Sequence, residues 1–390
     1  MAPNNLAAKT IDRRGRGVNT RILHVLPRFF GNIDTLYNLE RIGGAERYAV
    51  NLCRAQRKLG HESALMVFAE REGGLEVEGI PILLARATRC VPSINKDFDP
   101  LPMDLRRFAS ALISYEIVHT HSIASDVSIL LSVIRRIMKT QYRLMVTDHG
   151  WNGFTFSRVF QISKPMMRFS GFDGLLPVTS SSFSAFANSA RVFGPLYGGV
   201  DANLFRPLNG KRGRDVLFVG RIMPHKRLEN IIRALSSLDD KPRLIVIGPT
   251  LDLEYRIFLE RLSEELKVDT RFMGLVSDES LIRYYSSSTV LVLPSSEELF
   301  GIVLVEAMAC ELPVIAHNAR GIPAAVEDGN TGYLVRPGDI NQLSDRLQSL
   351  LTDHNEVIRL GTAGRRRVLE KFTWEHVAER ALAAYEEVLQ

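Results

Sequence analysis

Residues 215–235 read DVLFVGRIMPHKRLENIIRAL, and this stretch decides the fold class. An apolar run, DVLFVG, ends in the glycine at 220, and a helix-sized segment begins a few residues later. Short apolar strands that alternate with helices in this way build parallel sheets from βαβ units. We therefore expect an α/β fold.

The same alternation extends in both directions along the chain. Toward the C-terminus the expected strands are RLIVIG (243–248), RFMGLV (271–276), TVLVLP (289–294), PVIAHN (313–318) and GYLVRP (332–337). Toward the N-terminus they are RILHVLP (21–27), ESALMVFA (62–69), IPILLA (80–85), EIVHTH (116–121), RLMVTDH (143–149) and GLLPVT (174–179). This order predicts two doubly wound, Rossmann-like domains that face each other across a cleft, with ligands at the carboxyl ends of the strands.

The chain length supports two domains, because 390 residues exceed what one compact core usually holds. We expect a disordered basic tail over 1–20 and a first Rossmann-like domain over 21–190. A connection rich in Gly, Pro and Asn follows over 191–213. The second Rossmann-like domain is expected over 214–371, and a closing helix over 372–390.

The composition is that of a globular protein in water, with 45% apolar and 24% charged residues. No apolar run approaches the ~18–20 residues that span a bilayer, and no secretory signal is present, so we expect a cytoplasmic protein. Three widely spaced cysteines, Cys53, Cys90 and Cys310, favour a reducing compartment over a disulfide framework.

The net charge of +5 is unevenly distributed, at about +8 for residues 1–190 and about −3 for 191–390. Residues 135–168 contain seven basic side chains and one acid, Asp148, interleaved with apolar residues. This pattern fits a segment lying on the anionic inner face of a membrane, and it also fits a solvated helix face over a buried stripe. Nucleic acid is not an expected partner.

Two glutamates in PSSEELFGIVLVEAMA (294–309) are the first candidate site residues. A short loop that holds Glu298 is expected after the strand, and a helix from near Gly301. If the segment were helical throughout, Glu298 and Glu306 would lie ~12 Å apart, a distance that suits two carboxylates binding hydroxyls at opposite ends of a nucleotide sugar. Between them, Phe300 and Gly301 would offer backbone N–H groups to a diphosphate at a helix N-terminus. The alternative is that Glu298 caps the helix and Glu306 lies on the surface.

Two cations follow the strand at 215–220. Arg221 comes directly after Gly220, and Lys226 lies five residues later, where a helix is expected to start. As a glycosidic bond breaks, negative charge grows on the phosphate oxygens, and fixed cations stabilise this charge more than they stabilise the ground state. This pair therefore predicts a site for a leaving diphosphate.

These motifs, together with GGAER (43–47) and EDGNTGYLV (327–335), resemble the retaining GT-B glycosyltransferases of family 4. The resemblance runs from about Ile22 to Leu389. It implies that Glu298 contacts the transferred sugar and Glu306 the ribose. It also implies that the final helix, 372–389, packs back on the first domain.

The resemblance further implies that Arg221 and Lys226 bind the diphosphate and that Gly43 and Gly44 let the backbone approach the donor's phosphate or the acceptor. It places a histidine of HTHS (119–122), preferably His121, near the reacting carbon. The family is usually metal-independent, so neither a metal nor another cofactor is expected. The donor would be a nucleotide diphosphate sugar, and the acceptor a hydroxyl group of a polysaccharide, a lipid carrier or a small molecule.

Further signals are less specific. Asp148 and His149 could orient the acceptor, or they could be structural residues of a strand end. No Cys/His cluster has zinc spacing. Gly198 stands where an asparagine is common in the family. Two other functions remain open on this scaffold, namely a nucleotide-sugar epimerase and a non-catalytic nucleotide-sugar-binding partner.

Overall fold

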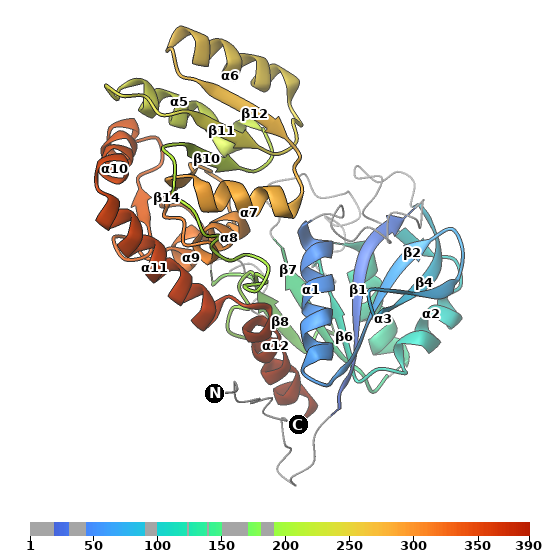
Figure 1. Ribbon diagram of the computed structural model, residues 1–390. Coiled ribbons are helices and arrows are strands. Elements are labelled where there is room, and N and C mark those ends of the chain that lie inside the picture. The colour runs from blue at the N-terminus through green and yellow to red at the C-terminus, as the bar shows by residue number, and fades with distance from the viewer. Residues whose placement is uncertain are drawn as a thin grey trace, which may run out of the picture. The chain divides into compact units, whose positions relative to one another are not determined.

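The computed structural model describes residues 19–30, 44–89, 100–122, 125–138, 140–149, 171–180 and 191–390 (Figure 1). It divides into two compact units. Unit 1 comprises Met1–Leu196 together with Trp374–Gln390, and unit 2 comprises Tyr197–Thr373. Gly43, Cys90 and nearly all of the predicted basic tail lie outside the described residues.

Unit 2 is built on a six-stranded parallel sheet. Its strands are β10 (Val216–Val219), β11 (Leu244–Ile247), β12 (Thr270–Gly274), β13 (Val290–Leu293), β14 (Val314–His317) and β15 (Tyr333–Val335). Every residue of β10, β11, β13 and β14 is buried, because helices cover both faces of the sheet. The spatial order is β12-β11-β10-β13-β14-β15, so the order reverses between β10 and β13.

The helices of unit 2 follow the strands as the alternation predicts. They are α5 (Leu228–Ser236), α6 (Leu253–Glu265), α7 (Asp278–Ser287), α8 (Ile302–Ala309), α9 (Ile322–Ala325), α10 (Ile340–Thr352) and α11 (His354–Lys371). Side chains cap several of them: Asp252 accepts from an N–H of the first turn of α6, and Ser277 does the same for α7. Helix α8 has six buried residues among eight, which explains its apolar sequence.

Unit 1 has a larger sheet with the same central order. The order is β3-β4-β2-β1-β6-β7-β8-β9, with β5 paired to β4. The strands are β1 (Arg21–Phe30), β2 (Glu62–Ala69), β3 (Gly73–Val77), β4 (Ile80–Arg89), β5 (Pro100–Pro102), β6 (Ile117–Thr120), β7 (Arg143–Asp148), β8 (Gly174–Pro177) and β9 (Arg191–Val192). Strands β3 and β5 pair antiparallel to β4, and the sequence pattern did not predict them or β9.

The two faces of this sheet have different covers. Helices α2 (Leu105–Leu112) and α3 (Asp126–Met138) bury alternate residues of β1 such as Leu23 and Val25. Helices α1 (Gly44–Lys58) and α12 (Trp374–Leu389) cover the opposite face, which carries Ile22. Tyr48 of α1 contacts Trp374 of α12 edge to face, with ring centroids 5.1 Å apart. The last helix of the chain thus belongs to unit 1.

Candidate functional site

The centre of the candidate site in unit 2 is an ion pair at the point where the strand order reverses. Lys226 ends a 3₁₀ turn, Pro224–Lys226, that follows β10, and Glu298 lies in the loop after β13. Lys226 Nζ donates to Glu298 Oε2 at 2.6 Å, and the two side chains are 11% and 20% exposed. Neighbouring strands β10 and β13 therefore bring together two residues that lie 72 positions apart.

His225 reports the electrostatics around this pair. Burial lowers its pKa, Lys226 and Arg221 lower it further, and Glu297 and Glu298 oppose the shift. The structure therefore places Arg221 in the same group of charges, with an exposed side chain. The Ser296 N–H donates to the carbonyl of His225 at 3.0 Å and ties the two loops together. Sequence reasoning missed His225, although it precedes Lys226 directly.

The start of α8 agrees with the helix start expected near Gly301. The helix begins at Ile302, and Gly301 caps it with a φ of +83°, a conformation that an L side chain rarely adopts. Glu298 therefore lies in a loop, and the ~12 Å spacing calculated for a continuous helix from Glu298 to Glu306 does not apply. Phe300 is buried against Phe372, with ring centroids 5.3 Å apart, so its ring anchors the loop.

Glu306 lies inside α8 and is 8% exposed, which rules out the surface alternative. Tyr285 of α7 donates its hydroxyl to Glu306 Oε2 at 3.0 Å. Burial and the neighbouring carboxylate raise the pKa of Tyr285 well above its usual value, so the hydroxyl keeps its proton. Tyr285 is a second residue that the sequence analysis did not single out.

In unit 1, the structure describes Gly44 in full but only the backbone of Asp148. Gly44 is the first residue of α1, and a Cβ added there would meet no atom within 4 Å. Asp148 ends β7 and pairs through its backbone with Pro177, while its side chain lies outside what the structure describes.

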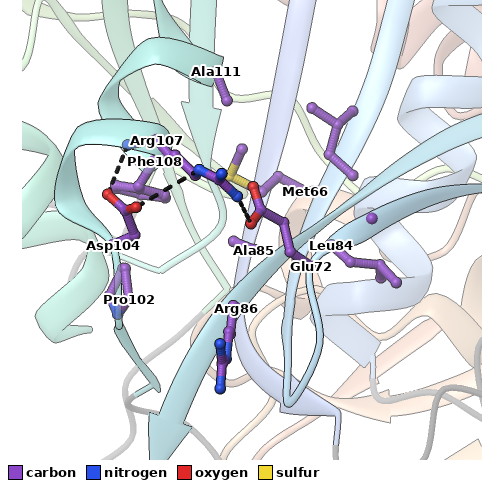
Figure 2. A pocket seen from close by; sticks show the side chains of 12 residues that line it. Met66, Glu72, Leu84, Ala85, Arg86, Pro102, Asp104, Arg107, Phe108 and Ala111 are labelled. Carbon is purple, nitrogen blue, oxygen red and sulfur yellow. Dashed lines mark hydrogen bonds and ion pairs between the residues drawn. The ribbon is translucent and has the colours of Figure 1, made fainter.

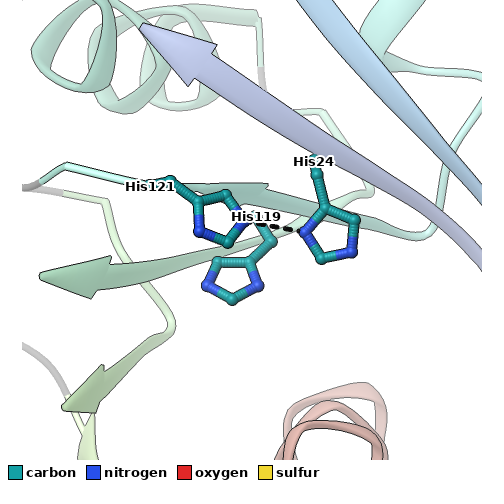
Figure 3. A group of neighbouring side chains, drawn as sticks. All are labelled: His24, His119 and His121. Carbon is teal, nitrogen blue, oxygen red and sulfur yellow. Dashed lines mark hydrogen bonds between the residues drawn. The ribbon is translucent and has the colours of Figure 1, made fainter. Parts of the chain in front are cut away.

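His121, which the resemblance places near the reacting carbon, lies in a buried group of histidines (Figure 3). Its Nε2 lies 2.9 Å from His24 Nδ1, and its Nδ1 lies 3.0 Å from His149 Nε2. His119, in β6, shares hydrogen bonds with Tyr385 of α12 and Thr147 of β7 at 2.5 and 2.8 Å. His119 and His121, the residue after the end of β6, thus both face the side of the sheet covered by α1 and α12.

Three of these imidazoles approach one another closely enough to suggest metal binding. One potential ligand atom each from His24, His119 and His121 lies within 4.8 Å of the others, the one such group among the described residues. However, each of their six ring nitrogens already shares a hydrogen bond with a protein group. The group is therefore assembled as a hydrogen-bond network, with no ring nitrogen left over for a cation.

Burial keeps the histidines of this network uncharged. It lowers the pKa of His24 to about 4 and that of His149 to about 3, and it lowers the pKa values of His119 and His121 well below their usual range. All four are therefore neutral at pH 7.

Two other features lie apart from the predicted site residues. A hollow of about 280 Å³ between β4, β5 and α2 has an apolar floor that includes Met66 and Phe108, and a charged rim with Glu72 and Arg107 (Figure 2). In the basic segment, Arg135 pairs with the partly buried carboxylate of Asp173 at 2.6 Å, so this cation stabilises the fold. No helix among the described residues is long and apolar enough to cross a bilayer.

Taken together, the two doubly wound units define the GT-B class, and the cations at the order reversal of unit 2 are suited to a phosphate group. Comparisons with known proteins agree. Residues 201–367 match the family model "Glycosyl transferases group 1", and residues 42–181 match "Glycosyltransferase Family 4". The chain belongs to the family 4 glycosyltransferases of group 1.

Two curated relatives show how similar individual proteins are to this chain. The chain is 34% identical to the MMP α-(1→4)-mannosyltransferase of Mycolicibacterium hassiacum over 223 residues, which cover 55% of this chain and 54% of that protein. It is 27% identical to the D-inositol 3-phosphate glycosyltransferase of Kribbella flavida over 387 residues, 88% of this chain and 90% of that protein.

Solved structures share the fold. Anabaena HepE in complex with UDP superposes with a TM-score of 0.72 at 18% identity, covering 94% of this chain and 100% of that structure. Sucrose-phosphate synthase from Thermosynechococcus elongatus gives a TM-score of 0.70 at 21% identity, covering 94% and 99%.

Proposed function

We propose that this chain transfers a hexose from a nucleoside diphosphate sugar to a hydroxyl acceptor, with retention of the anomeric configuration and without a metal. The observation that carries the proposal is the Lys226–Glu298 pair at the order reversal of unit 2, with Arg221 in the same group of charges. This is where doubly wound domains bind nucleotides.

Lys226 and Arg221 would bind the diphosphate oxygens. When the bond between the anomeric carbon and the phosphate oxygen breaks, the electron pair goes to the diphosphate, and the two fixed cations stabilise the added charge. Arg221 can bind two oxygens through its planar guanidinium, whereas Lys226 acts as a point charge. The N-terminus of α8, which no side chain caps, would offer its backbone N–H groups to the same phosphates.

The two glutamates would hold the donor on either side of the diphosphate. Glu298 would accept hydrogen bonds from hydroxyls of the transferred sugar, while its contact with Lys226 orients its carboxylate. Glu306, fixed by Tyr285, would bind the ribose hydroxyls. The acceptor hydroxyl then forms the new bond to the anomeric carbon on the face that the diphosphate leaves, and its proton goes to a departing phosphate oxygen.

The relatives support the chemical class of the substrates. HepE is a neighbour crystallised with UDP, and two relatives carry glycosyltransferase and mannosyltransferase names. We infer a nucleoside diphosphate hexose as donor and a soluble or lipid-linked hydroxyl compound as acceptor.

The first experiment identifies the donor. Thermal unfolding of the full chain is measured with UDP-, GDP- and ADP-hexoses, since a ligand at 100 times its Kd adds ~2.7 kcal/mol of stability. The stabilising donor, radiolabelled in the sugar, is then incubated with acceptors in EDTA. A labelled glycoside with the donor's anomeric configuration is the expected product. An epimerised nucleotide sugar without transfer, or binding with no turnover, would refute the proposal and favour one of the two other functions.

Peripheral contact with an anionic membrane is a separate proposal for the segment 135–168. It is supported by Ile137 and Met138, which are 76% and 54% exposed at the end of α3. Sedimentation with phosphatidylglycerol vesicles tests it: binding that weakens with salt is expected, and equal recovery with phosphatidylcholine vesicles would contradict it.

A further inference from the structure

Unit 1 buries a chain of hydrogen-bonded side chains that the proposed donor chemistry does not use. Its members are Gln56, His24, His121 and His149, in that order, and we call it the histidine chain. The successive contacts are Gln56 Oε1 to His24 Nε2 at 2.8 Å, His24 Nδ1 to His121 Nε2 at 2.9 Å, and His121 Nδ1 to His149 Nε2 at 3.0 Å. Figure 3 shows the central contact.

The histidine chain has a direction, which Gln56 sets. A carbonyl oxygen only accepts, so Gln56 Oε1 requires a hydrogen on His24 Nε2. A neutral imidazole has one N–H, and therefore His24 Nδ1 accepts from His121 Nε2–H. By the same rule His121 Nδ1 accepts from His149 Nε2–H. The last ring is left with an unprotonated Nδ1.

A second group at Gln56 supports this direction. Ser63 Oγ donates to the same Gln56 Oε1 at 2.9 Å. Two donors on one oxygen support this orientation of the amide, in which the buried Nε2 of Gln56 has no hydrogen-bond partner among the described residues.

His149 is placed to use its free lone pair. It directly follows β7, at the carboxyl end of the sheet where doubly wound domains bind ligands. The ring of Tyr48 packs against it edge to face, with centroids 4.7 Å apart. Its Nδ1 has no hydrogen-bond partner in the described part of the chain, and His149 is the least buried of the four residues.

We propose that the histidine chain fixes the tautomer of His149 so that its Nδ1 accepts a hydrogen bond from the sugar acceptor's hydroxyl group. Gln56 and His24 are then positioning residues, which act through His121. The identity of the ligand rests on the proposed function, while the tautomer does not.

The tautomer is tested by nuclear magnetic resonance of the full chain labelled with ¹⁵N at its histidines, at pH 7. Each of the four residues is assigned by the signal lost in its own variant. The expected spectrum has His149 neutral with its proton on Nε2, and His24 with its proton also on Nε2. A proton on Nδ1 of His149 would mean that the chain runs in the opposite direction and would overturn the inference, whatever the enzyme's activity.

The role in acceptor binding is tested by kinetics. Gln56→Met keeps the side-chain length and removes the oxygen. It is expected to mix the tautomers of His149 and to raise KM for the acceptor about three- to tenfold, which corresponds to the net free energy of one hydrogen bond. KM for the donor should stay unchanged. His149→Asn places an amide near the former Nδ1. Because an asparagine has no tautomer for the histidine chain to fix, adding Gln56→Met to His149→Asn should raise KM for the acceptor no further.

The possible results separate the two proposals. Equal acceptor KM in Gln56→Met and wild type, or additive effects in the double variant, would overturn the acceptor role. A wild-type protein that shows the expected tautomer but transfers no sugar to any acceptor would refute the proposed function and leave the fixed tautomer standing.

Discussion

Replacing Lys226 with methionine separates the electrostatic role of the cation from its structural one. Lys226 Nζ lies 2.6 Å from Glu298 Oε2, and both side chains are mostly enclosed. Breaking a fully buried pair costs about 3–5 kcal/mol, and an exposed pair is worth about 0–1 kcal/mol. With exposures of 11% and 20% we expect Lys226→Met to lose about 1–3 kcal/mol of unfolding free energy.

The effect on catalysis should be larger than this loss of stability explains. Removing one preorganised group that stabilises developing negative charge lowers kcat about 10²–10³-fold. Because the protein stays folded at 25 °C, this loss should remain in Lys226→Met/Glu298→Gln, where the uncompensated carboxylate is gone and stability is partly restored. Lys211→Met, at an exposed position, is the matched control.

The assay combines urea unfolding with initial rates of transfer from the identified donor. Lys226→Arg, which keeps the charge, should retain more activity than Lys226→Met. A kcat within threefold of wild type in Lys226→Met, or recovery of the rate along with stability in the double variant, would refute the assignment of Lys226 to the departing diphosphate.

Three further outcomes follow from the structure. Tyr285→Phe should destabilise the protein by about 1–2 kcal/mol and raise KM for the donor substrate, because the buried carboxylate of Glu306 loses one hydrogen-bond donor. Urea unfolding and kinetics measure both effects, and an unchanged KM would count against ribose binding. Gly198→Ala should lower the unfolding free energy by about 1–3 kcal/mol, since a Cβ there would lie 2.6 Å from the buried ring of Phe300. Gly194→Ala, whose Cβ would meet no atom within 4 Å, is the control and should change it little; equal urea midpoints for the two variants would contradict the packing. Burial holds the pKa of His24 at about 4, below the unfolded value near 6.5, so the unfolded state binds more protons between these pH values. On acidification through this window His24 alone should lower the unfolding free energy by up to about 1.4 kcal/mol per pH unit, in addition to the contributions of the other buried histidines, and His24→Gln should reduce the slope by that amount.

The sequence predicted the strands that decide the fold because their residues are buried on both sides. Runs such as VLFV at 216–219 and LIVI at 244–247 contain only apolar residues, a pattern typical of parallel sheets covered by helices. The antiparallel strands β3 and β5 were missed for the opposite reason. The first begins with two glycines and the second contains two prolines, and both residue types usually mark turns.

The chemistry of the donor side was more predictable than that of the histidines. Lys226 and Glu298 both follow apolar strands, and neighbouring strands bring their ends together, so a contact could be anticipated without distances. The hydrogen-bond partners of His121 could not be predicted, because hydrogen bonding in a buried layer depends on the register between strands. His24 pairs with His119 across β1 and β6, and only this alignment brings His24 beside His121. The left-handed backbone of Gly301 at the start of α8 likewise could not be predicted from residue spacing.

The helix α12 has a consequence for how the protein is made. Unit 2 is one continuous segment. Unit 1, in contrast, needs residues 374–390 to cover one face of its sheet, where Trp374 contacts Tyr48 and Tyr385 shares a hydrogen bond with His119. During vectorial synthesis the ribosome releases all of unit 2 before these residues appear. An apolar face of the nascent first unit therefore stays uncovered throughout that interval, so the unit whose translation starts first is the last to finish folding.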